Sequence, residues 1–203
     1  MIGEEPEGAT PLGPDDIEGL KFKHITTRDE LNELEQANVE SGLLWLGRRR
    51  KTDVLTQRFI SDLHQHLFGD VWDWAGQFRK REANIGVDPL QISIQLQMLL
   101  DDARFWAENK TYSPLEAGAR FHHRLVKIHP FRNGNGRHGR IAADTYLAER
   151  FGHAPIDWAA GHDLQHDNQR RSAYIAALRS ADGNDYDRLL AFVGLQPKPK
   201  SRS

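Results

Sequence analysis

The sequence predicts an all-α, mostly helical fold, and three observations support that prediction. Side chains typical of helix N-caps stand directly before apolar runs at several places in the chain. Apolar residues in these runs recur every three or four positions, as on the buried face of a helix. Strict apolar–polar alternation, which is typical of strands, is confined to one segment. The 203 residues, 38% of them hydrophobic, are enough for one domain of ordinary size.

The first half of the chain contains three helix starts. Thr27-Arg28-Asp29-Glu30 is a capping box, and we expect its helix to continue towards Trp45. Thr56 caps a second helix that ends near Gly69. Asp88-Pro89 begins a third, with proline at the first helical position. The following LQISIQLQM alternates like a strand, but apolar residues at 96, 99, 100, 103 and 106 restore the helical period, so we predict a helix.

The second half contains four more expected helices. Ser113-Pro114-Leu115-Glu116 combines a capping box with proline at the first position, and Pro130 ends the helix that follows. Another helix begins within NGNGR and runs towards Gly152. The last two lie around Tyr174–Leu178 and Leu189–Val193.

Between Trp74 and Asp88, the stretch AGQFRKREANIGV lacks a helical period and has glycine near both ends. We interpret it as a short β-hairpin flap. The expected organisation is an extended N-terminal segment at 1–25, a main domain at 26–195 and a flexible basic tail at 196–203.

The composition excludes several classes of protein. There is no cysteine, so disulfides and thiolate metal sites are impossible. The acidic N-terminus does not resemble a signal peptide, and no apolar run has membrane-spanning length, so we expect a cytoplasmic protein with no membrane partner. A net charge of −2 argues against a nucleic-acid partner. Yet residues 120–140 carry six basic side chains and no carboxylate, which favours a local polyanion site.

The glycine-rich stretch IHPFRNGNGRHGR has three interpretations. Gly134-x-Gly136-x-x-Gly139 matches a dinucleotide fingerprint, but that fingerprint requires a preceding strand and a helix is expected here. The glycines could also serve only to turn one helix into the next. The third interpretation is an anion cradle of helix N-terminal amides, with Arg137 and Arg140 adding charge and His129 nearby as a base. This last arrangement is typical of phosphoryl or nucleotidyl transfer.

HPFRNGNGRHGR resembles the active-site motif of Fic-domain proteins (the Fic/DOC family), HxFx(D/E)GNGRxxR. DVWDWAGQFRKREANIGV resembles the flap region of that family, and YIAALRSADGNDYDRLLAFV resembles its closing helices. The opening GATPL and HITTRDELNELEQAN are similar to the bacterial subgroup called mobile mystery protein B. The resemblance implies a Fic-type helical bundle. It also implies transfer of AMP from ATP to a hydroxyl side chain of a target protein.

The resemblance assigns roles to individual residues. His129 corresponds to the general base, Gly134, Asn135 and Gly136 to the anion hole, and Arg137 and Arg140 to ligands of the β- and γ-phosphates. The flap would dock the target as an added strand, with a Tyr, Ser or Thr hydroxyl presented to the nucleotide. The flap positions are Gly76, Gln77, Phe78, Arg79, Ile85 and Gly86. Self-modification and an antitoxin or regulator as partner are further implications.

Asn133 departs from the motif, because adenylylating members carry Asp or Glu there to hold Mg²⁺. An amide oxygen can coordinate a metal but adds no charge, so metal affinity should fall. Three outcomes follow: a weakened adenylyltransferase, a Doc-like protein kinase, or a nucleotide-binding pseudoenzyme or toxin–antitoxin module. The intact base and arginines favour the first. A Doc-like motif would carry Lys in place of Gly136.

Many Fic proteins carry an inhibitory helix with the motif (S/T)xxxE(G/N). The nearest match is QANVESG, which makes Glu40 the candidate inhibitory residue, although Gln36 and Ser41 depart from the pattern. The simpler interpretation is that Glu40 is a solvated helix residue.

Overall fold

The structure, a computed structural model, describes residues 11–49 and 53–195. In chain order the elements are α1 (Pro14–Glu18), α2 (Arg28–Arg48), α3 (Gln57–Phe68), the 3-10 turn η1 (Pro89–Gln91), α4 (Ile92–Asn109), α5 (Pro114–Ile128), α6 (Asn135–Phe151), α7 (Gln169–Asp182) and α8 (Asp187–Phe192). Within these described residues, extended segments pair at one isolated bridge, Leu20 with Trp72. The all-α prediction is confirmed.

The predicted caps form. The hydroxyl of Thr27 accepts from the Glu30 N–H at 3.3 Å, and the Glu30 carboxylate accepts from the Thr27 N–H at 3.1 Å, which completes a capping box. Thr56 and Ser113 accept from the amides of Phe59 and Glu116. Glu116 itself pairs with Arg120, so the second capping box is only half formed. Local side-chain chemistry therefore sets where these helices begin.

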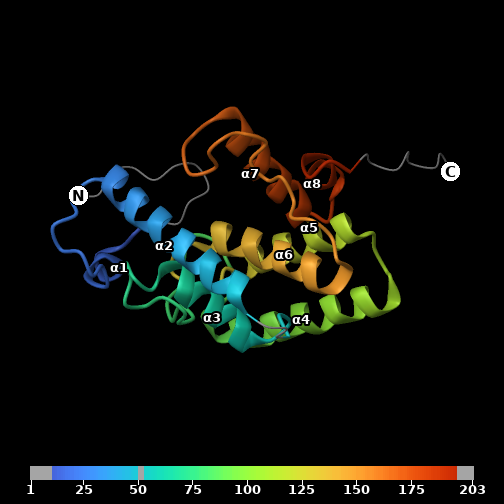
Figure 1. The fold of residues 1–203 in the computed structure, drawn as a ribbon, viewed down its shortest axis with the longest axis horizontal. Helices are drawn as coiled ribbons and strands as arrows, with labels where there is room; N and C mark the ends of the chain where they lie inside the picture. Colours follow the sequence, from blue (N-terminus) through green and yellow to red (C-terminus); the bar gives the residue numbers. More distant parts are fainter. Residues whose placement is uncertain (1–10, 50–52, 196–203) are drawn as a thin grey trace.

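Helices α5 and α6 run through the middle of the molecule, with α2 and α3 on one side, α4 along another and α7 and α8 above them (Figure 1). The Phe121 ring of α5 stacks on Tyr146 of α6, with centroids 5.0 Å apart. The Tyr146 hydroxyl donates to the Ala103 carbonyl of α4 at 2.7 Å. Gly118 allows a close approach of α5 to α6, because a Cβ there would lie 2.7 Å from Leu147. This packing fixes the α5–α6 loop between two buried helices.

The N-terminal segment, expected to be extended, contains the helix α1 in its described part. Pro14 occupies the first position of α1, and the Asp16 carboxylate accepts from the Gly13 N–H at 3.0 Å. The segment is attached to the turn after α3, since the Trp74 indole donates to the Asp16 carbonyl at 3.1 Å. The expected tail at 196–203 lies outside the described residues.

The hairpin expected between Trp74 and Asp88 does not form: the described residues of this segment contain no strand. The backbone of its arms bonds instead to the end of α5 and to the α5–α6 loop. The Arg79 amide donates to the Pro130 carbonyl at 2.9 Å, and the Val87 amide donates to the Ile128 carbonyl at 3.3 Å. The Arg79 guanidinium joins the arms by donating to the carbonyls of Arg81 (2.9 Å) and Val87. A side chain thus replaces the cross-strand ladder.

Among the described residues, none of the helices combines the length and the apolarity that crossing a bilayer would require.

Candidate active site

The loop that joins α5 to α6 is held in an unusual backbone conformation. His129 ends α5 with φ +54°, and Gly134 precedes α6 with φ +76°. A non-glycine residue rarely adopts positive φ, so the surrounding structure must hold His129 there. At Gly134 a Cβ would lie 2.7 Å from the Phe68 ring, so this position has no room for a side chain. The loop is therefore positioned closely against α3.

The first turn of α6 presents backbone amides. The first hydrogen bond within the helix runs from the His138 N–H to the Gly134 carbonyl at 2.9 Å. The amides of residues 135–137 precede that bond and have no acceptor within the helix. The Asn135 side chain is occupied elsewhere, since it exchanges hydrogen bonds with both backbone groups of Phe131 at 2.8 and 3.0 Å. The side chain of Asn135 thus shapes the loop, and only its backbone N–H is offered to an anion.

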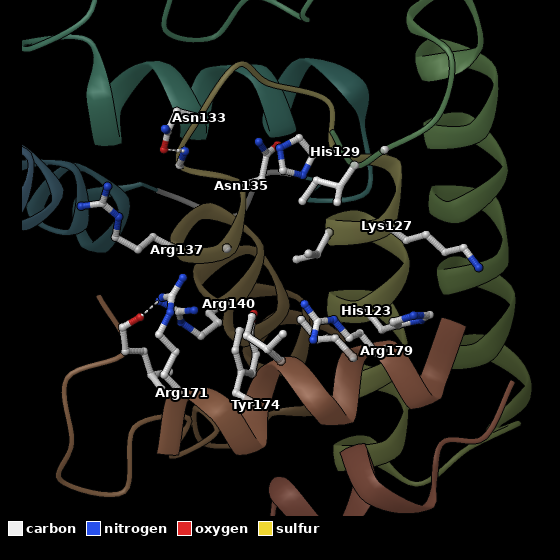
Figure 2. Close-up of a pocket in the computed structure, with 18 of the residues that line it drawn as sticks. His123, Lys127, His129, Asn133, Asn135, Arg137, Arg140, Arg171, Tyr174 and Arg179 are labelled. Atoms are coloured by element: carbon white, nitrogen blue, oxygen red, sulfur yellow. Dashed lines mark hydrogen bonds between the residues drawn. The ribbon is translucent and has the colours of Figure 1, made fainter. Parts of the chain in front are cut away.

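A cavity of about 550 Å³ opens beside this turn. His129 and the amide turn form part of its wall, and α2, the flap, α5, α7 and the segment before α7 also contribute to it (Figure 2). Four basic side chains outside the glycine motif also line it; they are Arg28, Lys127, Arg171 and Arg179. No local motif marks them, because they come from three different helices. A cavity this size with so many cations suits a polyanionic small molecule.

His129 is neutral at physiological pH. Its side chain is 4% exposed, and burial lowers its pKa to about 4, with the positive charge of Arg79 contributing in the same direction. A hydrogen bond with the Val126 carbonyl opposes this shift. Gly86 of the flap packs on the histidine, because a Cβ at Gly86 would lie 2.7 Å from that of His129. The ring is therefore an oriented proton acceptor at the cavity wall.

The two motif arginines contact different walls of the cavity. Arg137 extends toward α2, where it forms a buried ion pair with Glu35 (Figure 2). Arg140 lies 5.6 Å from the ring centroid of Tyr174 on α7 and hydrogen-bonds to its hydroxyl. That hydroxyl also forms a hydrogen bond with His122 Nε2, at 2.8 Å. The two guanidinium groups diverge toward different partners, although both line the same cavity.

A family model described as the Fic/DOC family matches residues 54–147, which include α3, the flap, and α4 to most of α6. Residues 54–147 therefore form a Fic/DOC family domain. The helices α2, α7 and α8 lie outside the matched range, although α2 and α7 both contribute to the Fic cavity.

Curated relatives share the domain but are much longer. The chain is 29% identical over 147 residues to the protein adenylyltransferase Fic of Aedes aegypti, covering 70% of this chain and 28% of that protein. It is 28% identical over 169 residues to the protein of the same name in Drosophila melanogaster, covering 81% and 32%. The chain thus spans about a third of the length of these relatives.

Solved Fic structures share the fold. The FIC domain of Bep8 from Bartonella sp. 1-1C superposes with a TM-score of 0.67 at 18% identity, covering 90% of this chain and 91% of that one. BepC from Bartonella tribocorum, with bound AMPPNP, gives 0.66 at 20% identity and covers 96% and 97%. Fic-1 from C. elegans gives 0.64 at 22% identity and covers 87% and 51%.

The Asn133 side chain folds back onto the α5–α6 loop. Its amide oxygen accepts from the Gly134 N–H at 2.6 Å. Within the described residues, no group of three His, Cys, Asp or Glu side chains is placed to hold a metal ion. Among the described residues that line the cavity, the single carboxylate is Asp182, which pairs with His123 and Lys127. The protein therefore offers a metal one neutral oxygen beside the amide turn.

His64 of α3 is a site residue that sequence reasoning missed. It is fully buried, and burial holds its pKa well below the usual value. Its Nδ1 accepts from the Gly76 N–H at 3.0 Å, so Nε2 carries the hydrogen and donates to the Asn133 carbonyl at 3.0 Å. Its ring stacks on Phe131 with centroids 3.8 Å apart. His64 thus fastens the start of the flap to the glycine loop.

The predicted flap residues separate into two groups. Ile85 and Gly86 line the cavity, and Ile85 is 40% exposed. Gly76, Gln77, Phe78 and Arg79 form the other arm, which does not line it. Arg79 is buried, and besides joining the flap arms it donates to the His129 carbonyl at 2.7 Å. Its side chain therefore holds the loop and is not presented to a target.

Glu40 is exposed on α2 and accepts from Gln36 at 3.2 Å, in agreement with the simpler interpretation of a solvated residue. The acidic side chain of α2 that does contact a motif arginine is Glu35. The motif spacing did not indicate Glu35, because it does not report which face of α2 is buried.

Proposed function

We propose that this chain is a protein adenylyltransferase, which transfers AMP from ATP to a hydroxyl side chain of a target protein. The observation that carries the proposal is that a neutral, buried histidine and an amide turn flanked by two arginines line one cavity. The curated relatives are named protein adenylyltransferases, and a neighbour in fold binds AMPPNP, an ATP analogue. These names support ATP as the substrate.

In the proposed reaction, the target hydroxyl oxygen attacks the α-phosphorus of ATP. A bond forms between that oxygen and phosphorus, the bond from phosphorus to the bridging oxygen of the β-phosphate breaks, and pyrophosphate leaves. His129 takes the hydroxyl proton. The amides of residues 135–137 and the positive end of α6 stabilise negative charge on the phosphates, and Arg137 and Arg140 bind the leaving pyrophosphate. Exposed flap residues such as Ile85 would contact the target.

Magnesium is part of the proposal in a reduced form. The donor set fits a Mg²⁺ ion held by nucleotide phosphates and water, with the Asn133 amide oxygen as a neutral protein ligand. When bound, the ion neutralises phosphate charge. With little metal-binding charge from the protein, the arginines must supply most of the positive charge.

The test of the proposal is incubation with a candidate target and ATP labelled at either the α- or the γ-phosphate. Label retained on protein from the α-position alone supports adenylylation. Label retained from the γ-position alone would show phosphorylation, the Doc-like alternative, and would contradict the proposal.

Replacing the proposed base gives the sharpest prediction. His129→Ala should reduce α-label transfer by at least about a hundredfold, because general-base catalysis contributes about that much. ATP affinity, measured by isothermal titration calorimetry, should change little. His162→Ala, which alters an exposed histidine outside the cavity, is the matched control. Equal loss of transfer and ATP binding in His129→Ala would instead assign the histidine to binding or folding.

One observation favours a second candidate, a nucleotide-binding regulatory module. The neutral Asn133 side chain weakens the metal site without removing any group that binds phosphate. ATP binding without transfer from either label would support this module. It would act by holding a partner protein, such as an antitoxin or another regulator.

We also propose a cytoplasmic bacterial setting within the mobile mystery protein B subgroup. The support is the opening sequence and the absence of cysteine. The target would be a protein with an accessible Tyr, Ser or Thr, or the chain itself. Tryptic mass spectrometry of a lysate after incubation with ATP would identify residues whose mass increases by one AMP group.

A further inference from the structure

Glu35 is a buried carboxylate with two assigned oxygens. It lies on α2, is 2% exposed, and directs one oxygen to the Arg137 guanidinium. Its other oxygen accepts from the Trp72 indole N–H at 2.8 Å. The side chain of Arg137 is 10% exposed, so this is an ion pair largely removed from water. Such a pair persists only when its geometry is good and its remaining polar groups are satisfied.

The anchoring by Trp72 restricts the carboxylate. Trp72 is fully buried, and its indole N–H can only donate, so rotation of Glu35 would leave a buried donor unsatisfied. The position of Glu35 is therefore set by the core. Arg137 is in turn confined by Glu35 on one side and by the Phe68 ring, 4.9 Å from its guanidinium carbon, on another.

A guanidinium group carries five N–H donors in one plane. The pair with Glu35 is made through Nη2, and Arg137 still lines the cavity beside the amide turn. Fixing one edge of the plane fixes the direction of the donors on its other edges. Arg140 differs, because its partner on α7 is the neutral Tyr174 hydroxyl. The two arginines are therefore held by different means, one by a charge and one by a hydroxyl.

We propose that Glu35 is a positioning residue for nucleotide binding: it holds Arg137 so that the remaining donors of the guanidinium face the phosphates of ATP. This inference rests on the proposed function, because it takes ATP as the ligand. It differs from inhibition by a competing carboxylate. A competing carboxylate would have to release the arginine when phosphate binds, whereas the Trp72 hydrogen bond and the burial of Glu35 hold it in place.

The test is Glu35→Gln in the full chain. Glutamine has nearly the same size and keeps an oxygen that can accept from Trp72, but it removes the charge that orients Arg137. We expect the Kd for ATP to rise about tenfold, the loss of one charge-assisted contact. The affinity for adenosine, which has no phosphate, should not change. In transfer assays the KM for ATP should rise similarly, while kcat stays within about twofold.

Two further variants sharpen the result. Glu33→Gln changes an exposed glutamate on the same helix and should leave ATP affinity as it is. In an Arg137→Ala background, Glu35→Gln should have no further effect on ATP affinity, because a positioning residue acts only through the group it positions. If Glu35→Gln does not fold, Trp72→Phe keeps an aromatic ring, removes the anchoring N–H, and should weaken ATP binding in the same direction by a smaller factor.

Tighter ATP binding or faster transfer in Glu35→Gln would overturn the proposal and assign Glu35 an inhibitory role. Unchanged ATP affinity, or an equal loss for adenosine, would also overturn it and leave the pair a purely structural one. These outcomes are read from binding, so they are separate from the label-transfer test. ATP binding without transfer would contradict the adenylyltransferase proposal alone, and failure of the unaltered chain to bind ATP would contradict both.

Discussion

At the scale of single residues, Asn133 determines how much charge the protein contributes to metal binding. Its amide oxygen accepts from the Gly134 N–H and carries no charge toward a metal. In the proposed reaction, the positive groups around the cavity would therefore supply most of the charge that compensates the phosphates. We infer that Asn133 weakens catalysis through the metal and leaves nucleotide binding largely intact.

Asn133→Asp should therefore raise the affinity of the site for Mg²⁺. The carboxylate can keep the hydrogen bond to the Gly134 amide while adding a charged ligand, so half-maximal activity should need about tenfold less Mg²⁺. Transfer of α-label measured across a Mg²⁺ titration checks this expectation. An unchanged titration midpoint would show that the amide is not what limits metal binding.

At the scale of elements, the flap illustrates what the sequence could predict and what it could not. Helix starts such as Thr27 and Thr56 were predicted because a cap and its partner lie three residues apart. The prediction of a hairpin was wrong because Arg79 forms a long-range contact: its side chain donates to the carbonyl of His129, 50 residues away. Its guanidinium also donates to carbonyls in the flap, and the apolar–polar pattern of the sequence does not reveal such contacts.

We expect the flap to lose its position when the Arg79 guanidinium is removed. Arg79→Met keeps the length of the side chain but abandons the carbonyls of His129, Arg81 and Val87. We expect transfer to a protein target to fall by at least about tenfold through misplacement of His129 and of the docking arm. ATP affinity should change much less. Lys80→Met, an exposed neighbour, is the control, and equal activity of the two variants would contradict this role.

The candidate site was predicted as far as its motif extends. His129, the glycines and both arginines were found because they lie within a dozen residues of one another. His64 and Glu35 were missed because their contacts span 69 and 102 residues. Neither carries a local signature, since a buried histidine or glutamate has the same letter as an exposed one.

At the scale of the whole molecule, buried histidines connect stability to pH, and five of the described histidines are buried with a lowered pKa, His123 among them. Burial lowers the pKa of His122 to about 3 and those of His129 and His138 to about 4, and holds that of His64 well below its usual value. Between about pH 6.5 and 4 the unfolded chain therefore binds more protons than the folded chain. Stability is fully present above pH 6.5 and is lost as the pH falls through that range.

Asp144 opposes this trend. Burial raises its pKa to about 6, so its contribution to stability is present at low pH and is lost as the pH rises through 6. One carboxyl cannot offset five imidazoles, and the urea midpoint should be lower at pH 5 than at pH 7. Urea unfolding followed by circular dichroism measures this difference. An equal midpoint at both pH values would contradict the buried, neutral state of these histidines.

The ion pair between α2 and α6 also bears on where this protein can be cut. We propose residues 26–195 as the Fic domain, and the matched stretch 54–147 is shorter at both ends. A fragment trimmed to the match would retain every letter of the glycine motif. It would lose Glu35, which pairs with Arg137, and Tyr174, which lies beside Arg140. Truncation at the motif boundaries would therefore keep the motif but remove the residues that hold its two arginines.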